Sequence, residues 1–326
     1  MKKVFRVLLI IIVVVIVAVA GIVTYIKTAL PNVGAAQNIK VEITPARMER
    51  GKYIANHVAV CVDCHSHRDW NYYAGPIQEG TFAGGGEKFG KEIQFPGTLY
   101  SKNITPYGLH NWTDGEIFRA ITTGVDKDGH ALFPLMGYLG YGKMDTEDVY
   151  SVIAYVRSLP SIKNDVPKRE LDFPVNILVN TMPQKASLSY KPDSNNLVEY
   201  GKYITTIANC IECHSKVDKG ARIAGTEFGG GREFDFPNGT TVTSVNITSD
   251  NETGIGTWTK DMFIQKFAGY TDSSYHLQPV SKTDYNTVMP WIMYSGMTAH
   301  DLGAIYDYLR TVKPLKNKVE PFKKKS

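Results

Sequence analysis

Two short motifs hold all four cysteines of the chain, and each one joins a cysteine pair to a histidine at a fixed spacing. They occupy residues 61–65 and 210–214, and both read Cys-x-x-Cys-His. On one helical turn, two thiols three residues apart can each add to a vinyl group of the same porphyrin. The next residue then places an imidazole under the ring, within reach of the iron. The predicted residues at these two covalent haem c sites are Cys61, Cys64, His65, Cys210, Cys213 and His214.

A zinc site and a redox dithiol are the alternative interpretations of these motifs. Zinc would need four ligands that converge from both motifs, which is awkward if each motif belongs to a separate unit. A thioredoxin-like dithiol would need a βαβ pattern nearby, and the sequence has none. Covalent haem is the interpretation that uses every residue of the motif.

An internal repeat surrounds both motifs. The recurring segments are Gly51-Lys52-Tyr53-Ile54 with Gly201-Lys202-Tyr203-Ile204, the triple glycines at 84–86 and 229–231, and Asn103-Ile104-Thr105 with Asn246-Ile247-Thr248. The offset drifts between 143 and 153, as expected when only loops change length. We therefore predict two copies of one fold, over residues 45–160 and 195–315.

Three aligned pairs could supply the sixth iron ligand: Met136 with Met289, Met144 with Met297, and His130 with His276. The second methionine pair precedes a predicted helix N-cap and has an apolar residue at the N4 position, which is the pattern of a hydrophobic staple. The first pair lies in segments without helical periodicity, where a side chain can project into a pocket. We predict Met136 and Met289 as ligands, and the histidine pair remains an alternative.

The elements that position these residues are predicted to be helices joined by long loops. Each copy ends in a helix with one apolar face, formed by Val149, Val152, Ile153 and Val156 or by Leu302, Ile305, Tyr306 and Leu309. Asp145 with Asp148, and Thr298 with Asp301, fit variants of the capping box at the helix starts. Short helices at 51–59 and 201–208 should lead into the cysteine motifs. The intervening segments are rich in Gly, Asn, Thr and Pro, so we predict loop there and an all-α fold.

A membrane-spanning helix is predicted at 7–26. This run has 20 residues, broken only by Gly21 and Thr24, and would cover about 30 Å at about 1.5 Å per residue. The basic residues before it favour a cytoplasmic N-terminus at 1–6 and an exported remainder. Ala18-Val19-Ala20 resembles a signal-peptide cleavage site, but the apolar run continues past it, which favours an uncleaved anchor.

Composition excludes several classes of protein. The chain has 326 residues, with 43% hydrophobic and 21% charged, which is typical of globular proteins. The net charge of +4 comes from the first 27 residues, so no basic domain suggests a nucleic-acid partner. Lys323-Lys324-Lys325 is interpreted as a solvated tail. Two of the Asn-x-Thr sequences belong to the repeat motif, which argues against glycosylation.

The predicted organisation follows from these features. It comprises a cytoplasmic N-terminus at 1–6, a transmembrane anchor at 7–26, a linker at 27–44, repeat one at 45–160, a proline-rich linker at 161–194, repeat two at 195–315, and a basic tail at 316–326.

The motifs together resemble the class I cytochrome c domains of membrane-bound multihaem cytochromes. They include the Cys-x-x-Cys-His pairs, the triple glycines, Asn-Ile-Thr, the segment 253–258, and Met289-Pro290-Trp291 before the final helix. The chain is similar to the cytochrome c subunits of periplasmic alcohol and gluconate dehydrogenases. The resemblance implies that Met136 and Met289 ligate iron. Trp112 and Trp258 match a family tryptophan that hydrogen-bonds a haem propionate, although a core role also fits them. The first copy has Gly137 where the family has proline.

Iron bound by His and Met has no open position for a substrate, so such a centre passes single electrons. We expect a membrane-tethered dihaem electron carrier, not an enzyme, on the periplasmic side of a bacterial inner membrane. It would act in a respiratory chain, or as the haem subunit of a dehydrogenase complex. Expected partners are a quinol-oxidising complex, a dehydrogenase or a terminal oxidase. The alternative is a haem enzyme such as a dihaem peroxidase or thiosulfate dehydrogenase, in which the two copies should differ at the sixth ligand.

Overall fold

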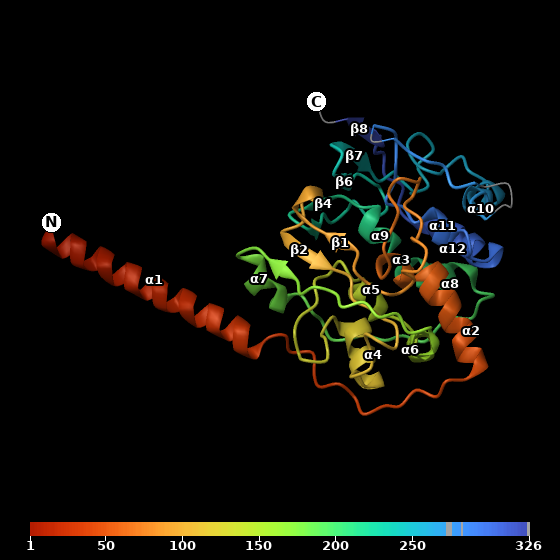
Figure 1. The fold of residues 1–326 in the computed structure, drawn as a ribbon. Helices are drawn as coiled ribbons and strands as arrows, with labels where there is room; N and C mark the ends of the chain where they lie inside the picture. The colour runs from red at the N-terminus through yellow and green to blue at the C-terminus, as the bar shows by residue number, and fades with distance from the viewer. Residues whose placement is uncertain (272–275, 282, 325–326) are drawn as a thin grey trace.

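A long N-terminal helix, α1 (Lys2–Ala29), projects from the body of the molecule (Figure 1). The computed structural model describes residues 1–271, 276–281 and 283–324, so Lys325 of the predicted tail lies outside the described residues. The mean hydropathy of the most apolar window of α1 is 3.4, and none of its residues is buried in the protein. Its length and composition are those of a helix that can cross a membrane, as predicted.

Each repeat contains the same helices in the same order. In the first repeat they are α2 (Pro45–Tyr53), η1 (Ile54–Val58), α3 (Cys61–Cys64), α4 (Asp114–Thr123), α5 (Tyr138–Tyr141) and α6 (Thr146–Ser158). In the second they are α8 (Leu197–Ile207), α9 (Cys210–Cys213), α10 (Lys260–Ala268), α11 (Trp291–Tyr294) and α12 (Ala299–Thr311). The predicted terminal helices are confirmed. Helices α4 and α10 lie in segments that we had predicted to be loop.

The first and last helices of each repeat cross in close contact at a glycine. A Cβ atom on Gly51 of α2 would lie 1.9 Å from the Ser151 carbonyl oxygen of α6. A Cβ on Gly201 of α8 would lie 1.9 Å from the Ala304 carbonyl oxygen of α12. Only a residue without a side chain lets the two backbones approach this closely.

One extra residue in the first repeat is accommodated by a π-helix. Ten residue steps separate Gly51 from Cys61, but nine separate Gly201 from Cys210. The π-helical segment η1 lies between Gly51 and Cys61, whereas the equivalent part of the second repeat continues α8 as an ordinary helix. A π-turn absorbs a single inserted residue without changing the direction of the helix. The cysteines therefore occupy equivalent positions in both repeats.

Short strands show that the fold is not all-α, contrary to the prediction. The strands are β1 (Lys88–Phe89), β2 (Gly97–Tyr100), β3 (Glu170–Leu171), β4 (Val217–Asp218), β5 (Ala221–Arg222), β6 (Glu233–Asp235), β7 (Thr240–Thr243) and β8 (Phe322–Lys324). They form antiparallel sheets in the orders β1-β2-β3, β4-β5 and β6-β7-β8. Strand β8 belongs to the predicted solvated tail, so the described part of that tail pairs with the second repeat instead.

The linker between the repeats also holds defined structure. Besides β3 it contains α7 (Val175–Leu178) and η3 (Val179–Thr181), and η2 (Lys91–Ile93) is a further short helix in the first repeat. The end of α1 contacts α7 and η3. Strand β3 pairs with β2, so the linker lies against the first repeat (Figure 1).

In each repeat, the N-terminus of the last helix is hydrogen-bonded to a tyrosine hydroxyl of the other repeat. Tyr203 accepts a hydrogen bond from the Asp145 backbone N–H (2.9 Å) and donates one to Asp148 Oδ2 (2.8 Å). In the reciprocal contact, the Tyr53 hydroxyl accepts from the backbone N–H of Thr298 (3.2 Å) and donates to Asp301 Oδ2 (2.7 Å).

This exchange corrects the predicted capping boxes. The N-cap side chains do accept backbone hydrogen bonds, Asp145 from Glu147 and Thr298 from Asp301. The acidic residues at N3, however, receive a tyrosine hydroxyl from the other repeat and do not bond back to the N-cap backbone. One continuous hydrophobic cluster contains buried residues of both repeats. The two repeats therefore share a core and an interface.

A buried ion pair at this interface gives a stability prediction. Arg50 Nη2 lies 2.7 Å from Asp148 Oδ2, and the Asp148 side chain is 2% exposed. Asp148→Asn should lower the free energy of unfolding by about 3–5 kcal/mol, because it leaves Arg50 without its charged partner. Glu147→Gln is the matched control, since the Glu147 side chain is 63% exposed in its pair with Arg47; about 0–1 kcal/mol is expected. Equal losses in denaturant titrations would contradict this.

Acid should weaken the same interface. Burial alone would raise the pKa of Asp148, but the hydrogen bonds and charge of Arg50 hold it below its ordinary value. Such a carboxyl stabilises the fold above its unfolded-state pKa of about 3.9, and the contribution is lost as the pH falls through the folded-state value. Unfolding measured against pH should show stability declining below about pH 4, with a smaller decline in Asp148→Asn.

Candidate functional site

Both Cys-x-x-Cys-His motifs form a single helical turn. The backbone N–H of His65 donates to the Cys61 carbonyl at 3.0 Å, and that of His214 donates to the Cys210 carbonyl at 2.9 Å. The residue before each turn has left-handed backbone, with φ of 46° at Val60 and 54° at Asn209. Each repeat therefore places two thiols and one imidazole on one short turn, and haem attachment there stays a prediction.

The two imidazoles are oriented in the same way. Nδ1 of His65 lies 2.6 Å from the Lys102 carbonyl oxygen, and Nδ1 of His214 lies 2.8 Å from the Val245 carbonyl oxygen. A carbonyl can only accept, so Nδ1 carries the proton and the Nε2 lone pair is available to a metal. Desolvation by the surrounding protein lowers the pKa of both histidines. Neutral rings with a free Nε2 are what iron ligation requires.

The triple glycines hydrogen-bond to the histidine of each motif, and the Asn-Ile-Thr motifs lie next to these glycines. Gly85 N–H donates to the His65 carbonyl, and Gly230 N–H donates to the His214 carbonyl, both at 2.8 Å. Gly85 and Gly230 have φ of +71° and +70°, a region that favours glycine. The buried Asn103 accepts from Thr105 Oγ1 at 2.7 Å, and Asn246 accepts from Thr248 Oγ1 at 2.8 Å. These asparagines therefore serve the fold.

The two methionine pairs differ in environment. Met144 and Met297 are buried, 1% and 6% exposed, and belong to the core cluster, which fits the staple interpretation. Met136 and Met289 are only partly buried. Each of these two precedes a turn in which its carbonyl accepts a hydrogen bond two residues on, from Tyr138 (2.7 Å) or Trp291 (2.8 Å).

A tyrosine links each methionine turn to the cysteine motif of its own repeat. Tyr141 donates to the Ala59 carbonyl and Tyr294 donates to the Ala208 carbonyl, both at 2.9 Å. Burial raises the pKa of both hydroxyls, and the nearby cysteine thiols add to the shift. The structure thus brings the methionine segment and the Cys-His turn of one repeat to the same side of the core.

The remaining predicted residues lie in two kinds of place. His130 and His276 are exposed, and His130 Nδ1 lies 3.4 Å from Asp126; this favours the methionines as ligands. Trp112 and Trp258 pack against the hydrophobic cluster. Within the described residues neither indole N–H has a protein acceptor, so a haem propionate as partner stays a prediction.

Sequence reasoning missed the arginines that pair with the acidic residue inside each motif. Asp63 Oδ2 lies 3.1 Å from Arg68, and Glu212 Oε1 lies 2.7 Å from Arg222. Burial raises the pKa of Asp63, which the Arg68 charge opposes. The signal in the sequence was an acidic residue at the same motif position in both copies, with an arginine a few residues later.

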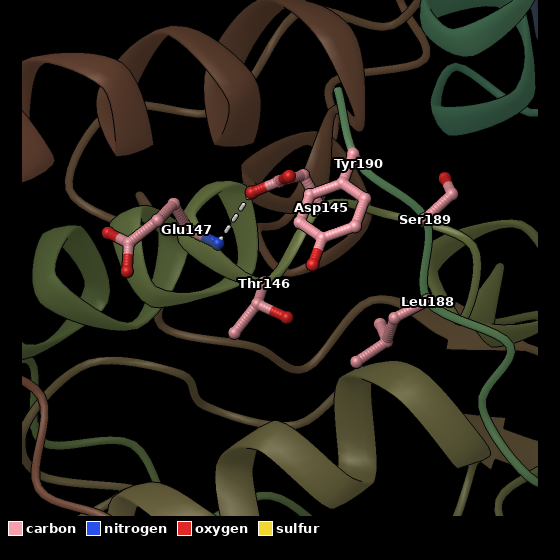
Figure 2. Close-up of a pocket in the computed structure, with 6 residues that line it drawn as sticks. All are labelled: Asp145, Thr146, Glu147, Leu188, Ser189 and Tyr190. Atoms are coloured by element: carbon pink, nitrogen blue, oxygen red, sulfur yellow. Dashed lines mark hydrogen bonds between the residues drawn. The ribbon is translucent and has the colours of Figure 1, made fainter. Parts of the chain in front are cut away.

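A surface pocket of about 410 Å³ lies elsewhere, where the linker passes the start of α6 (Figure 2). Its lining residues are Asp145, Thr146, Glu147, Leu188, Ser189 and Tyr190. In Figure 2 the Asp145 carboxylate accepts from the Glu147 backbone N–H at 2.8 Å, which is the helix N-cap bond. None of the six is a cysteine, histidine or methionine, so this pocket is separate from the predicted haem sites.

Comparison with known proteins supports cytochrome c chemistry. The chain is 29% identical over 297 residues to a fructose dehydrogenase cytochrome subunit of Gluconobacter japonicus, covering 83% of this chain and 54% of that protein. It is 25% identical over 287 residues to the cytochrome c subunit of a quinone-dependent alcohol dehydrogenase of Gluconacetobacter polyoxogenes, covering 83% and 57%. It is 24% identical over 280 residues to a gluconate 2-dehydrogenase cytochrome c subunit of Pantoea cypripedii, covering 77% and 60%.

A dihaem c-type cytochrome of Cereibacter sphaeroides is also similar, 24% identical over 164 residues, which cover 48% of this chain and 53% of that protein. No family model matches the chain. The chain spans between 54% and 60% of the length of the three dehydrogenase subunits. The resemblance inferred from the motifs is confirmed: the homologues are cytochrome c subunits of dehydrogenases and a dihaem cytochrome.

The donor set of each repeat fits a c-type haem. It offers two thiols on one turn, a neutral imidazole with a free Nε2, and a thioether on a turn tied to the same core. Burial raises the pKa of the Cys61 and Cys210 thiols to about 12, so neither is a thiolate at neutral pH.

The two methionine pairs can be distinguished by substitution. Met289→Ala should remove the Met–iron charge-transfer absorbance of the second haem and let carbon monoxide bind there, and Met136→Ala should do so at the first haem. Met297→Ala should leave the spectrum unchanged and cost about 2–5 kcal/mol of stability, because it opens a cavity in the core. A changed haem spectrum in Met297→Ala would identify Met144 and Met297, and not Met136 and Met289, as the ligand pair.

Proposed function

We propose that the chain is a membrane-tethered dihaem c-type cytochrome that carries single electrons in a periplasmic respiratory chain. The observation that carries this proposal is the duplicated set of donors: each repeat has a Cys-x-x-Cys-His turn whose imidazole is fixed through Nδ1, and a methionine turn beside it. Haem iron supplies one-electron oxidation and reduction when bound in such a set.

The residues of the chain have holding and shielding roles in this proposal. The two cysteines of each turn fix the haem edge, and the carbonyl of Lys102 or Val245 fixes the imidazole plane. The tyrosines at 141 and 294 keep the methionine turns against the core. Rigid axial ligands change little between oxidation states, which suits a centre whose only task is to accept and release an electron.

A catalytic haem would need an open coordination position, and each repeat offers a methionine, Met136 or Met289, that would fill it. Three contacts recur with nearly the same distances in both repeats: the histidine Nδ1 to a backbone carbonyl, a glycine N–H to the histidine carbonyl, and the hydrogen bond to the methionine carbonyl. A dihaem peroxidase or thiosulfate dehydrogenase would need the two sites to differ. An electron carrier needs only two similar sites close enough to exchange electrons.

A dehydrogenase is the partner that the similar proteins favour. Three of them are named as cytochrome subunits of fructose, alcohol and gluconate dehydrogenases. We propose that the present chain accepts electrons from such a catalytic subunit, or from a quinol-oxidising complex, at the periplasmic face of an inner membrane, and passes them to a terminal oxidase.

Haem content tests the proposal. Alkaline pyridine spectra should report two covalently bound c-type haems per chain, retained after acid–acetone extraction, and one in a chain with Cys210→Ser and Cys213→Ser. The wild type should not bind carbon monoxide rapidly at either haem. Rapid binding at one haem would mean that this iron is five-coordinate, and would favour the enzyme alternative.

The anchor is tested by fractionation. The mature chain should sediment with membranes, retain Met1 or Lys2 at its N-terminus, and expose its haem repeats to protease added from the periplasmic side. The reason is that α1 is long and apolar enough to cross a membrane. An N-terminus at Gly21 would show that Ala18-Val19-Ala20 is cleaved.

A further inference from the structure

The two methionine turns have nearly the same backbone, although one contains glycine and the other proline. Gly137 has φ −69° and ψ 32°, and Pro290 has φ −79° and ψ 63°. Proline fixes φ near −65°, so the backbone of Gly137 already suits proline. Among the described residues the Gly137 N–H has no backbone acceptor. Backbone geometry therefore does not explain why the first repeat lacks the proline.

The neighbour of Gly137 does explain it. A Cβ atom on Gly137 would lie 2.3 Å from Nδ2 and 2.9 Å from Cγ of Asn209, and 3.0 Å from Cζ of Tyr141. A Cβ on Gly140, one turn later, would lie 2.4 Å from Asn209 Oδ1. The Asn209 amide thus packs directly on the backbone of α5 and is the nearest group in the space that a Cβ atom would need at either position.

Asn209 belongs to the other repeat, where it immediately precedes Cys210. Its amide is held by a hydrogen bond from Nδ2 to the Ile207 carbonyl (3.1 Å), and its left-handed backbone, φ 54°, is one that asparagine tolerates well. Helix α8, which ends two residues earlier, contacts α5 as well. The turn that follows Met136 therefore rests on the segment that carries the second cysteine motif.

The second methionine turn is contacted differently. Nδ1 of His57 lies 2.8 Å from the Met293 carbonyl oxygen, and a Cβ on Gly296 would lie 2.1 Å from that nitrogen. These contacts are at the far end of α11, three or more residues after Pro290. In this repeat the proline ring itself restricts the turn.

We propose that Asn209 is a positioning residue for Met136, and so sets the sixth ligand of one haem from beside the attachment site of the other. This inference rests on the proposed function, in which Met136 ligates the first haem. In the first repeat the Asn209 amide restrains the turn from outside, as the Pro290 ring restrains the second turn from within. The ligand turn of the first haem then rests on a residue next to the attachment site of the second.

The test is a substitution and its suppressor, in full-length chain that carries Met289→Ala so that the Met–iron charge-transfer band reports the first haem alone. Gly137→Pro should abolish the band, lower the potential of the first haem and open it to carbon monoxide, because the ring collides with Asn209. Adding Asn209→Gly should restore at least half of the band, since glycine keeps the left-handed backbone and removes the amide. Pro290→Gly in the same Met289→Ala background is the matched control and should leave the band of the first haem unchanged.

A band that survives Gly137→Pro, or that stays absent after Asn209→Gly is added, overturns the proposal. If Gly137→Pro yields no folded protein, Asn209→Gly alone decides: carbon monoxide should bind the first haem faster than in the parent chain, because the turn after Met136 loses the side chain that packs on it. An unchanged rate overturns the positioning role. A band that is already absent with Met289→Ala alone would instead remove Met136 as a ligand, a failure of the proposed function that is distinguishable from the other outcomes.

Discussion

The close crossing of two helices at a glycine is the constraint on which the rest of the structure depends. At Gly51 and Gly201 the backbone of the first helix meets a carbonyl of the last helix, and no side chain fits between them. This contact fixes the direction in which the chain leaves the first helix, and the cysteine motif follows within ten residues. It also brings the start of the last helix to the repeat interface, where a tyrosine of the other repeat can reach it.

The two repeats consequently depend on each other at several points. Tyr53 and Tyr203 each cap a helix of the other repeat, one continuous hydrophobic cluster runs through both, and Asn209 packs on the turn after Met136. Each of these tyrosine hydroxyls donates a hydrogen bond to a buried acidic side chain of the other repeat, Asp148 or Asp301. Duplication of one unit has here produced a pair whose halves complete each other's helix ends.

The sequence predicted the chemistry better than the packing. The Cys-x-x-Cys-His turns, the repeat and the apolar faces of α6 and α12 follow from spacing alone, because one helical turn or a 3.6-residue period determines them. Helix α4 was missed although Thr113 and Glu116 form a full capping box, a signal that was in the sequence. The tyrosine exchange, the Asn209 contact and the pairing of β8 with β7 could not be predicted, since each joins residues that only the arrangement of the two repeats brings together.

The linker that holds the anchor has a mechanical consequence. Helix α1 contacts α7 and η3, and β3 of the same linker is hydrogen-bonded to β2 of the first repeat. In the proposed anchored form, these contacts would restrict how far the repeats can tilt about α1. A partner that diffuses in the same bilayer would then meet a narrow range of orientations. The encounter of the two proteins would then be a search in the plane of the membrane, in which the orientation of this chain is already restricted.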